Sequence, residues 1–323
     1  MASPPLRTIG IAGSGAVGLF YGARLARTGF DVRFLMRRDL PHAQRHGIQV
    51  RSPEGDFHLP RPTVAGSGAD LGPCDLVLVT AKTTQTDSLL PHLHSMLHSQ
   101  STLLTLQNGL GPEETLATAF PHHTVHRGVC FVCLNRTGPA EVTHLRHGSV
   151  GIGAFRPEPD PALPAVAAAF EAAGISCKLA PHLNTLLWKK LVWNIPFNGL
   201  GIAAGGIGTA AILASPDLSA RARRLMAEVI AVANALGCSI PDTLIDHQFA
   251  QTEVMGDYLP SSVLDYLAGH PVELDAIWSE PLRRAQATSV PTPELRRLET
   301  EIRHRLTPLT SNRVGQTENR APA

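Results

Sequence analysis

The fold of this chain is decided near its N-terminus, by the stretch Thr8-Ile9-Gly10-Ile11-Ala12-Gly13-Ser14-Gly15-Ala16-Val17-Gly18. An apolar run that suits a buried strand leads into the pattern G-x-G-x-x-G, and a helical pattern follows it. There, Gly13 permits a tight turn, Gly15 lets the backbone approach a pyrophosphate, and Gly18 lets helix and strand pack closely. The stretch predicts a dinucleotide site rather than a merely structural turn. Its residues are Gly13, Ser14, Gly15, Ala16, Val17 and Gly18.

The next strand indicates which dinucleotide is bound. An NAD site usually carries an acidic residue at the tip of this strand, where it holds the ribose hydroxyls. Here the strand expected at 31–36 is followed by Arg37-Arg38, and Asp31 lies at its opposite end. Arginine can pair with a 2′-phosphate through two hydrogen bonds. The sequence therefore predicts NADP (NADPH) as the cofactor, with Arg37 as the phosphate contact; the alternative is a solvated arginine pair followed by Asp39.

The rest of the chain divides into two parts with different patterns. Up to about residue 180, short apolar runs at 76–81 and 102–106 alternate with helical patterns, and a three-stranded meander at the sheet edge is expected from 129–134, 142–145 and 150–155. After Pro181 the pattern is helical, starting with a helix capped by Asn184. This order predicts an N-terminal Rossmann-type doubly wound α/β sheet over 1–181, then an all-α C-terminal domain over 182–311. Residues 312–323 are expected to form a disordered tail.

Composition narrows the class of protein. Lysine and arginine number 28 against 27 acidic residues, a net charge of +1 that argues against nucleic-acid or anionic-membrane partners. No apolar run is long enough to span a membrane, and the first residues do not have the pattern of a signal peptide, so we expect a cytoplasmic protein. The oligomeric state stays open between monomer and homodimer.

Two features that could bind a metal are given little weight. The pair Cys130 and Cys133 forms a C-x-x-C motif, but it lies in a strand-like run without a second pair of ligands. The fifteen histidines have no neighbouring carboxylate motif. We therefore predict no metal site and buried structural thiols.

The most informative stretch of the second half is Trp188-Lys189-Lys190-Leu191-Val192-Trp193-Asn194-Ile195-Pro196-Phe197-Asn198. Lys190, Asn194 and Asn198 follow at i, i+4 and i+8 and share one helical face. Their apolar surroundings favour a position of this face in a cleft. The alternative is a solvated polar stripe. Lys189, one step round the helix, is expected to be solvated. Pro196 should kink the helix before Asn198.

These residues resemble those of the ketopantoate reductase family (2-dehydropantoate 2-reductases). The glycine stretch, Arg37, Thr80-Ala81-Lys82, Gln107-Asn108-Gly109, the Lys190 series and Ser261…Glu273-Leu274-Asp275 occur in the family's order, from Thr8 to about Leu306. The resemblance implies reduction of ketopantoate to pantoate with NADPH, in the pathway to pantothenate and coenzyme A. It implies that Lys190 is the catalytic lysine and Glu273 its acidic partner in the cleft. It also implies substrate binding by Asn194, Asn198 and Ser261, with Lys82 and Asn108 at the junction of cofactor and substrate.

The residue types suit this chemistry. A ketone that receives a hydride develops negative charge on oxygen, which a lysine ammonium can stabilise and protonate. The chain departs from the family pattern at Leu259 and at 267–271, both near the expected substrate site. A small 2-oxo acid other than ketopantoate, or a related ketone, is therefore an alternative substrate. A non-catalytic NADP(H) sensor is a weaker alternative, because Lys190 and Glu273 are both present.

Overall fold

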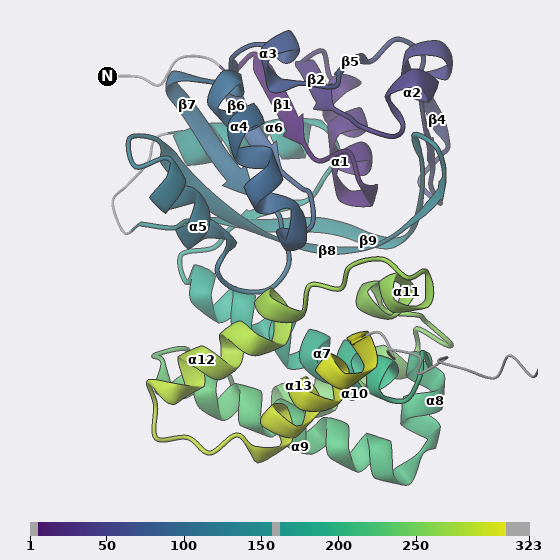
Figure 1. The fold of residues 1–323 in the computed structure, drawn as a ribbon, viewed down its shortest axis with the longest axis vertical. Helices are drawn as coiled ribbons and strands as arrows, with labels where there is room; N and C mark the ends of the chain where they lie inside the picture. Colours follow the sequence, from purple (N-terminus) through teal and green to yellow (C-terminus); the bar gives the residue numbers. More distant parts are fainter. Residues whose placement is uncertain (1–5, 157–161, 308–323) are drawn as a thin grey trace, which may run out of the picture.

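A computed structural model describes residues 6–156 and 162–307, so the tail expected at 312–323 lies outside the described residues. Its ten-stranded sheet forms the N-terminal part, and helices form the C-terminal part below it in Figure 1. Six strands are parallel, in the order β5-β2-β1-β6-β7-β8. Their bounds are β5 (Thr63–Ala65), β2 (Asp31–Leu35), β1 (Thr8–Ala12), β6 (Cys74–Val79), β7 (Leu97–Thr105) and β8 (Thr124–Gly138). This is the strand order of a doubly wound dinucleotide fold, as predicted.

Helices cover both faces of this sheet. The continuous apolar strands require this, because their residues alternate between the two faces. On β6, Leu76 and Leu78 pack in the cluster that includes α1, whereas Val77 and Val79 pack against α4. The helices of this part are α1 (Ala16–Ala26), α2 (Leu40–His46), α3 (Gly68–Leu71), the 3₁₀ turn η1 (Thr83–Gln85), α4 (Thr86–Met96), α5 (Pro112–Ala119) and α6 (Ala162–Ala172).

The prediction of a three-stranded meander at the edge was wrong. One hairpin of two long strands, β8 and β9 (Glu141–Ala154), occupies this region. The polar break that suggests a turn, at His147 and Gly148, is a bulge with positive φ at both residues, where the register between the two strands shifts. The hairpin lies inside the sheet because β9 also pairs with β3 (Ile48–Arg51), which pairs with β4 (Phe57–Leu59), and with β10 (Cys177–Leu179).

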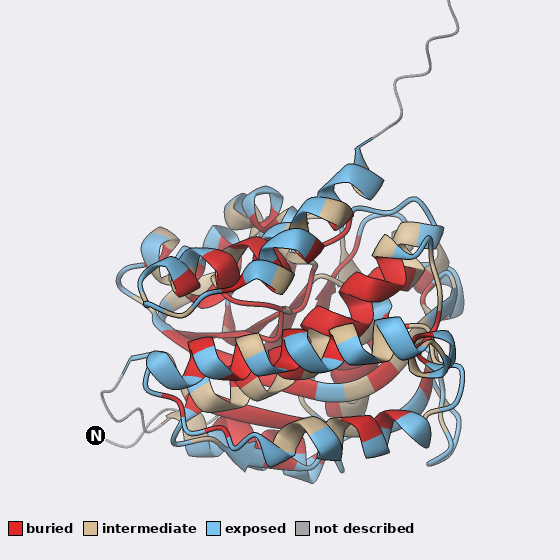
Figure 2. Ribbon diagram, turned by 90° about the horizontal axis from the view of Figure 1, so that it is seen from below, coloured by how far each residue is buried: buried red, intermediate tan, exposed pale blue. Residues whose placement is uncertain are grey.

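The C-terminal part is helical from residue 183 to residue 306. Its central element is α7 (Leu183–Ala203), which packs against α9 and α13 and lies against the hairpin β8–β9. The other elements are α8 (Thr209–Ala214), α9 (Pro216–Ala235), α10 (Thr243–Glu253), α11 (Ser261–Leu267), the π-helical turn η2 (Asp275–Ser279), α12 (Glu280–Gln286) and α13 (Pro293–Leu306). Figure 2 shows these helices with buried residues turned inward and exposed residues outward.

One expectation about α7 needs correction. It begins at Leu183, after His182, so Asn184 is not its N-cap. The helix contains Pro196 and runs to Ala203. Pro196 has no N–H to give to the Val192 carbonyl, and the neighbouring Ile195 carbonyl accepts a hydrogen bond of 3.1 Å from the Trp278 indole.

Among the described residues, no helix is long and apolar enough to cross a bilayer.

Candidate active site

The glycine loop lies at the carboxyl end of β1, where the winding of the sheet reverses between β1 and β6. Gly13 has φ +108°, and a Cβ there would lie 2.3 Å from the Ala81 backbone nitrogen. A Cβ on Gly18 would lie 2.2 Å from the Gly13 carbonyl oxygen. A Cβ on Gly15, in contrast, would meet no atom of the described chain within 4 Å. The loop therefore needs glycine for its own geometry at Gly13 and Gly18, and leaves open space at Gly15, which suits a pyrophosphate at the start of α1.

The end of β2 lies beside this loop, because the Ser14 hydroxyl donates a hydrogen bond of 2.9 Å to the Leu35 carbonyl. Arg37 and Arg38 are exposed, and their side chains form no hydrogen bond or ion pair with residues 6–156 or 162–307. Asp39 is engaged elsewhere: it pairs with Arg136 and accepts a hydrogen bond of 3.0 Å from the Ala140 N–H. The two arginines are thus free to meet an anion, and the nearby carboxylate is neutralised.

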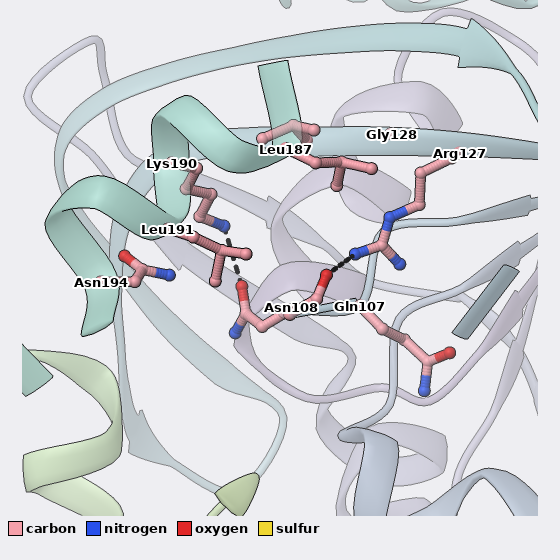
Figure 3. Close-up of a pocket in the computed structure, with 10 residues that line it drawn as sticks. Gln107, Asn108, Arg127, Gly128, Leu187, Lys190, Leu191 and Asn194 are labelled. Carbon is pink, nitrogen blue, oxygen red and sulfur yellow. Dashed lines mark hydrogen bonds between the residues drawn. The ribbon is translucent and has the colours of Figure 1, made fainter. Parts of the chain in front are cut away.

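Lys190, Asn108 and Glu273 come from three separate segments and form one hydrogen-bonded chain. The Lys190 ammonium on α7 donates to Asn108 Oδ1 at 2.8 Å (Figure 3). Asn108 Nδ2 donates to Glu273 Oε2 at 3.3 Å, and the Thr83 N–H donates to Glu273 Oε1 at 2.8 Å. The lysine and the carboxylate that sequence reasoning assigned to one cleft are therefore linked through Asn108.

Electrostatics make the Lys190 ammonium a readier proton donor than an ordinary lysine. Burial lowers its pKa, because a charged group loses hydration there. The Glu273 carboxylate opposes this change, while the positive charge of Arg127 adds to it. A lysine with a lowered pKa gives up its proton more easily at neutral pH.

A small pocket lies directly against Lys190 and Asn108 (Figure 3). It is bounded by β8, the loop after β7 and one face of α7. Its lining residues are Gln107, Asn108, Gly109, Arg127, Gly128, Val129, Leu187, Lys190, Leu191 and Asn194.

Lys82 follows β6, next to Thr83, and pairs with Asp265 of α11. This ion pair joins the sheet to the helical part. Its lysine is partly exposed, so the ammonium can also meet an anion that enters the crevice.

The three residues expected to bind substrate have different surroundings. Asn194 lines the pocket beside Lys190. Asn198 is buried: its Oδ1 accepts a hydrogen bond of 2.9 Å from the Ser262 N–H, and its Nδ2 donates to the Asn194 carbonyl at 3.1 Å. Ser261 is exposed at the first residue of α11. In this arrangement Asn198 uses its amide to hold the start of α11 against α7.

Sequence reasoning missed several residues of the site. Arg127 lines the pocket, Thr83 holds Glu273, Asp265 pairs with Lys82, and Arg136 donates to the Ser14 carbonyl at 3.1 Å. Only Arg127 had a visible signal, as a lone charge inside an apolar strand pattern. Cys130 and Cys133 are buried free thiols, and burial raises the pKa of both.

Comparison with known proteins identifies both parts of the chain. A family model described as ketopantoate reductase PanE/ApbA matches residues 9–157, and the model of its C-terminal part matches residues 182–305. The chain is 35% identical to a 2-dehydropantoate 2-reductase of Nostoc sp. strain PCC 7120, over 90% of this chain and 92% of that protein.

Two crystal structures of 2-dehydropantoate 2-reductases are similar over their full length. The Geobacter metallireducens GS-15 structure has a TM-score of 0.89 and 39% identity, covering 92% of this chain and 99% of that one. The Methylococcus capsulatus structure has a TM-score of 0.83 and 31% identity, covering 92% and 96%.

Proposed function

Because this chain belongs to the ketopantoate reductase family, we propose that it reduces 2-dehydropantoate to pantoate, with NADPH as the hydride donor. The family consists of oxidoreductases that use a nicotinamide cofactor and act on a small 2-oxo acid. Two parts of this proposal need separate support. They are the preference for NADPH over NADH and the roles of the individual residues. A cytoplasmic location stays a prediction.

The observation that carries the proposal is the chain Lys190–Asn108–Glu273 at the carboxyl ends of the parallel strands. In doubly wound sheets this crevice is where a dinucleotide and its substrate meet. These three hydrogen-bonded residues bring a proton donor, an amide and a carboxylate to that position from both parts of the molecule.

The residues around the glycine loop fit a dinucleotide. The open space at Gly15 and the start of α1 would receive the pyrophosphate. Arg37 would receive the 2′-phosphate, because it is exposed beside the loop. When bound, the nicotinamide supplies the hydride.

The protein residues stabilise the charge that develops on the substrate and supply the proton. The Lys190 ammonium stabilises the negative charge that develops on the substrate carbonyl oxygen, and gives that oxygen a proton. Asn108 fixes the direction of the ammonium by accepting its hydrogen bond. Glu273 partly offsets the effect of burial on the Lys190 pKa. Lys82, with Asn194 and Ser261, would bind the substrate's carboxylate and hydroxyl.

A panel of small 2-oxo acids tests this function. Purified protein is mixed with NADPH and each acid, and loss of the NADPH absorbance is followed. We expect kcat/KM to be highest for 2-dehydropantoate. A higher value for another branched 2-oxo acid would overturn the substrate assignment but keep the reductase.

The second candidate is such a reductase with a different 2-oxo acid. It is favoured by Leu259 and by the segment 267–271, which depart from the family pattern beside α11. If no acid is reduced while NADPH still binds, the protein is an NADP(H)-binding sensor instead.

A further inference from the structure

Arg127 is a buried charge that the proposed reaction does not use directly. It lies on β8 with 1% of its side chain exposed, and Glu113 of α5, 3% exposed, lies opposite with 3.5 Å between Nη1 and Oε2. A buried charge pair is costly to desolvate unless hydrogen bonds satisfy it. Here Arg127 Nε and Glu113 Oε2 have no hydrogen-bond partner among the residues that the structure describes. A contribution to folding stability therefore does not by itself explain why this charge pair is buried.

The guanidinium group has a more specific contact. Arg127 Nη2 donates a hydrogen bond of 2.8 Å to the Gly109 carbonyl, and Nη1 lies 3.5 Å from the Thr105 hydroxyl. Thr105 ends β7, and Gly109 follows Asn108 directly. Arg127 thus contacts both ends of the short loop that carries Asn108, and Figure 3 shows its bond next to Asn108.

The other side of this loop is held by the helical part. Gly109 has φ +76°, and a Cβ there would lie 2.3 Å from the Ala276 carbonyl oxygen on η2. The Leu110 N–H donates to the same carbonyl at 2.9 Å. The backbone on either side of Asn108 therefore has little freedom, with Arg127 on one side and η2 on the other.

We propose that Arg127, held by Glu113, is a positioning residue for the reaction: by fixing the Gly109 carbonyl it sets the place of Asn108, and through Asn108 the direction of the Lys190 ammonium. Arg127 itself touches neither cofactor nor substrate in this account. The proposal rests on the proposed function for its kinetic readout.

The test compares Arg127→Met with the double variant Arg127→Met/Glu113→Gln. The single variant leaves Glu113 buried without its partner, so a loss of folding stability is expected and would obscure the kinetics. The double variant removes both charges, and its melting temperature should return toward that of the wild type. Its kcat should stay about 10- to 100-fold low, because a misplaced catalytic group costs rate even in a stable fold.

A matched control separates positioning from a merely structural role, and the pH profile reports the effect of the Arg127 charge on Lys190. The charged and titratable groups facing Lys190 are Arg127, Glu273 and the Cys130 thiol. Removing the positive charge of Arg127 should move the alkaline limb of kcat to higher pH in the double variant. Arg221→Met is the matched control, since Arg221 is a half-buried arginine paired with Glu294 and Glu301 away from the crevice. It should lower stability and leave kcat and the pH profile as in the wild type.

Each result decides the proposal. A stable double variant with low kcat and a shifted limb supports it. A wild-type kcat in the double variant, or an equal loss of kcat in Arg221→Met, overturns it.

If the wild type reduces none of the acids, the proposed function fails, and NMR signals decide instead. The chain has only the lysines Lys82, Lys178, Lys189 and Lys190, so ¹³C-methylated lysine signals are readily assigned by NMR. The NMR signal of the Asn108 side-chain amide, which accepts the Lys190 hydrogen bond, is followed beside them. A changed Asn108 signal in the double variant but not in Arg221→Met supports the proposal, and an unchanged signal overturns it.

Discussion

Lys190 and Asn108 are joined by a hydrogen bond of 2.8 Å between Nζ and Oδ1, although 82 positions separate them in the sequence. Lys190 belongs to the central helix of the helical part, and Asn108 to the loop after a strand of the sheet. The bond crosses the boundary between the two parts, at the point where the sheet opens into a crevice. Both parts are therefore needed to form the site.

Gly15→Ala tests the cofactor loop. Gly15 has φ −74°, which alanine adopts without strain, and its added Cβ would touch no described atom within 4 Å. We expect unfolding stability to stay within about 0.5 kcal/mol of the wild type. The Kd for NADPH, measured by fluorescence titration, should rise at least about tenfold, because the methyl group occupies the space left for the pyrophosphate. Unchanged NADPH binding would place the dinucleotide elsewhere.

Arg37→Ala tests the choice of dinucleotide. A charge-assisted contact is worth about 1.5–3 kcal/mol, so the KM for NADPH should rise about 10- to 100-fold while that for NADH stays the same. The neighbouring exposed Arg38 provides the matched control, and Arg38→Ala should change the preference less. If the ratio of NADPH to NADH efficiency is unaltered in Arg37→Ala, another residue holds the 2′-phosphate.

Glu273→Gln tests the electrostatic coupling in the site. The Glu273 charge raises the Lys190 pKa, so removing it lowers that pKa. Reduction needs protonated Lys190, so activity is present below its pKa and falls as the pH rises through it. The alkaline limb of kcat/KM should therefore move to lower pH, opposite to the shift expected for Arg127→Met/Glu113→Gln. Glu280→Gln, which removes one of the carboxylates that pair with Arg283 and Arg284 on α12, should leave the limb in place. A limb that does not move in Glu273→Gln would show that Glu273 does not act on Lys190.

Gly109→Ala tests the restraint on the Asn108 loop. Gly109 and Gly111 both have positive φ, so alanine costs about 1–2 kcal/mol of backbone strain at either position. Only at Gly109 does the Cβ also meet a backbone atom, the Ala276 oxygen at 2.3 Å; at Gly111 the nearest atom is 4.0 Å away. We expect Gly109→Ala to lower the melting temperature more than Gly111→Ala and to reduce kcat as well. Equal kcat values in the two variants would contradict a role for this contact.

The alternation of apolar strands and helices was sufficient to predict the doubly wound sheet and the helical part that follows. Local sequence patterns gave wrong predictions where long-range contacts determine the secondary structure. The polar residues His147 and Gly148 resemble a turn, yet pairing with β8 carries the strand through them as a bulge.

In the candidate site, too, local patterns predicted some residues and long-range contacts determined the rest. Spacing on one helix brought Lys190 and Asn194 together, and the glycine pattern predicts the cofactor loop. Sequence could not reveal that Asn198 holds α11, because its partner, the Ser262 N–H, is 64 positions away. Nor could it reveal the pairing of Arg127 with Glu113, which depends on how α5 packs against β8.

The central claim is that the Lys190 ammonium supplies the proton in reduction of a 2-oxo acid. Its most direct test is the kcat of Lys190→Ala for NADPH-dependent reduction of 2-dehydropantoate, measured beside Lys189→Ala and beside the NADPH Kd of each variant. Lys189 is the matched control, since it is the adjacent lysine on α7 and its side chain forms no hydrogen bond or ion pair with the described part of the chain. We predict that Lys190→Ala loses about 10²- to 10⁴-fold in kcat, the range for a positioned proton donor, while it still binds NADPH and Lys189→Ala stays active. A Lys190→Ala variant with wild-type kcat would contradict the account.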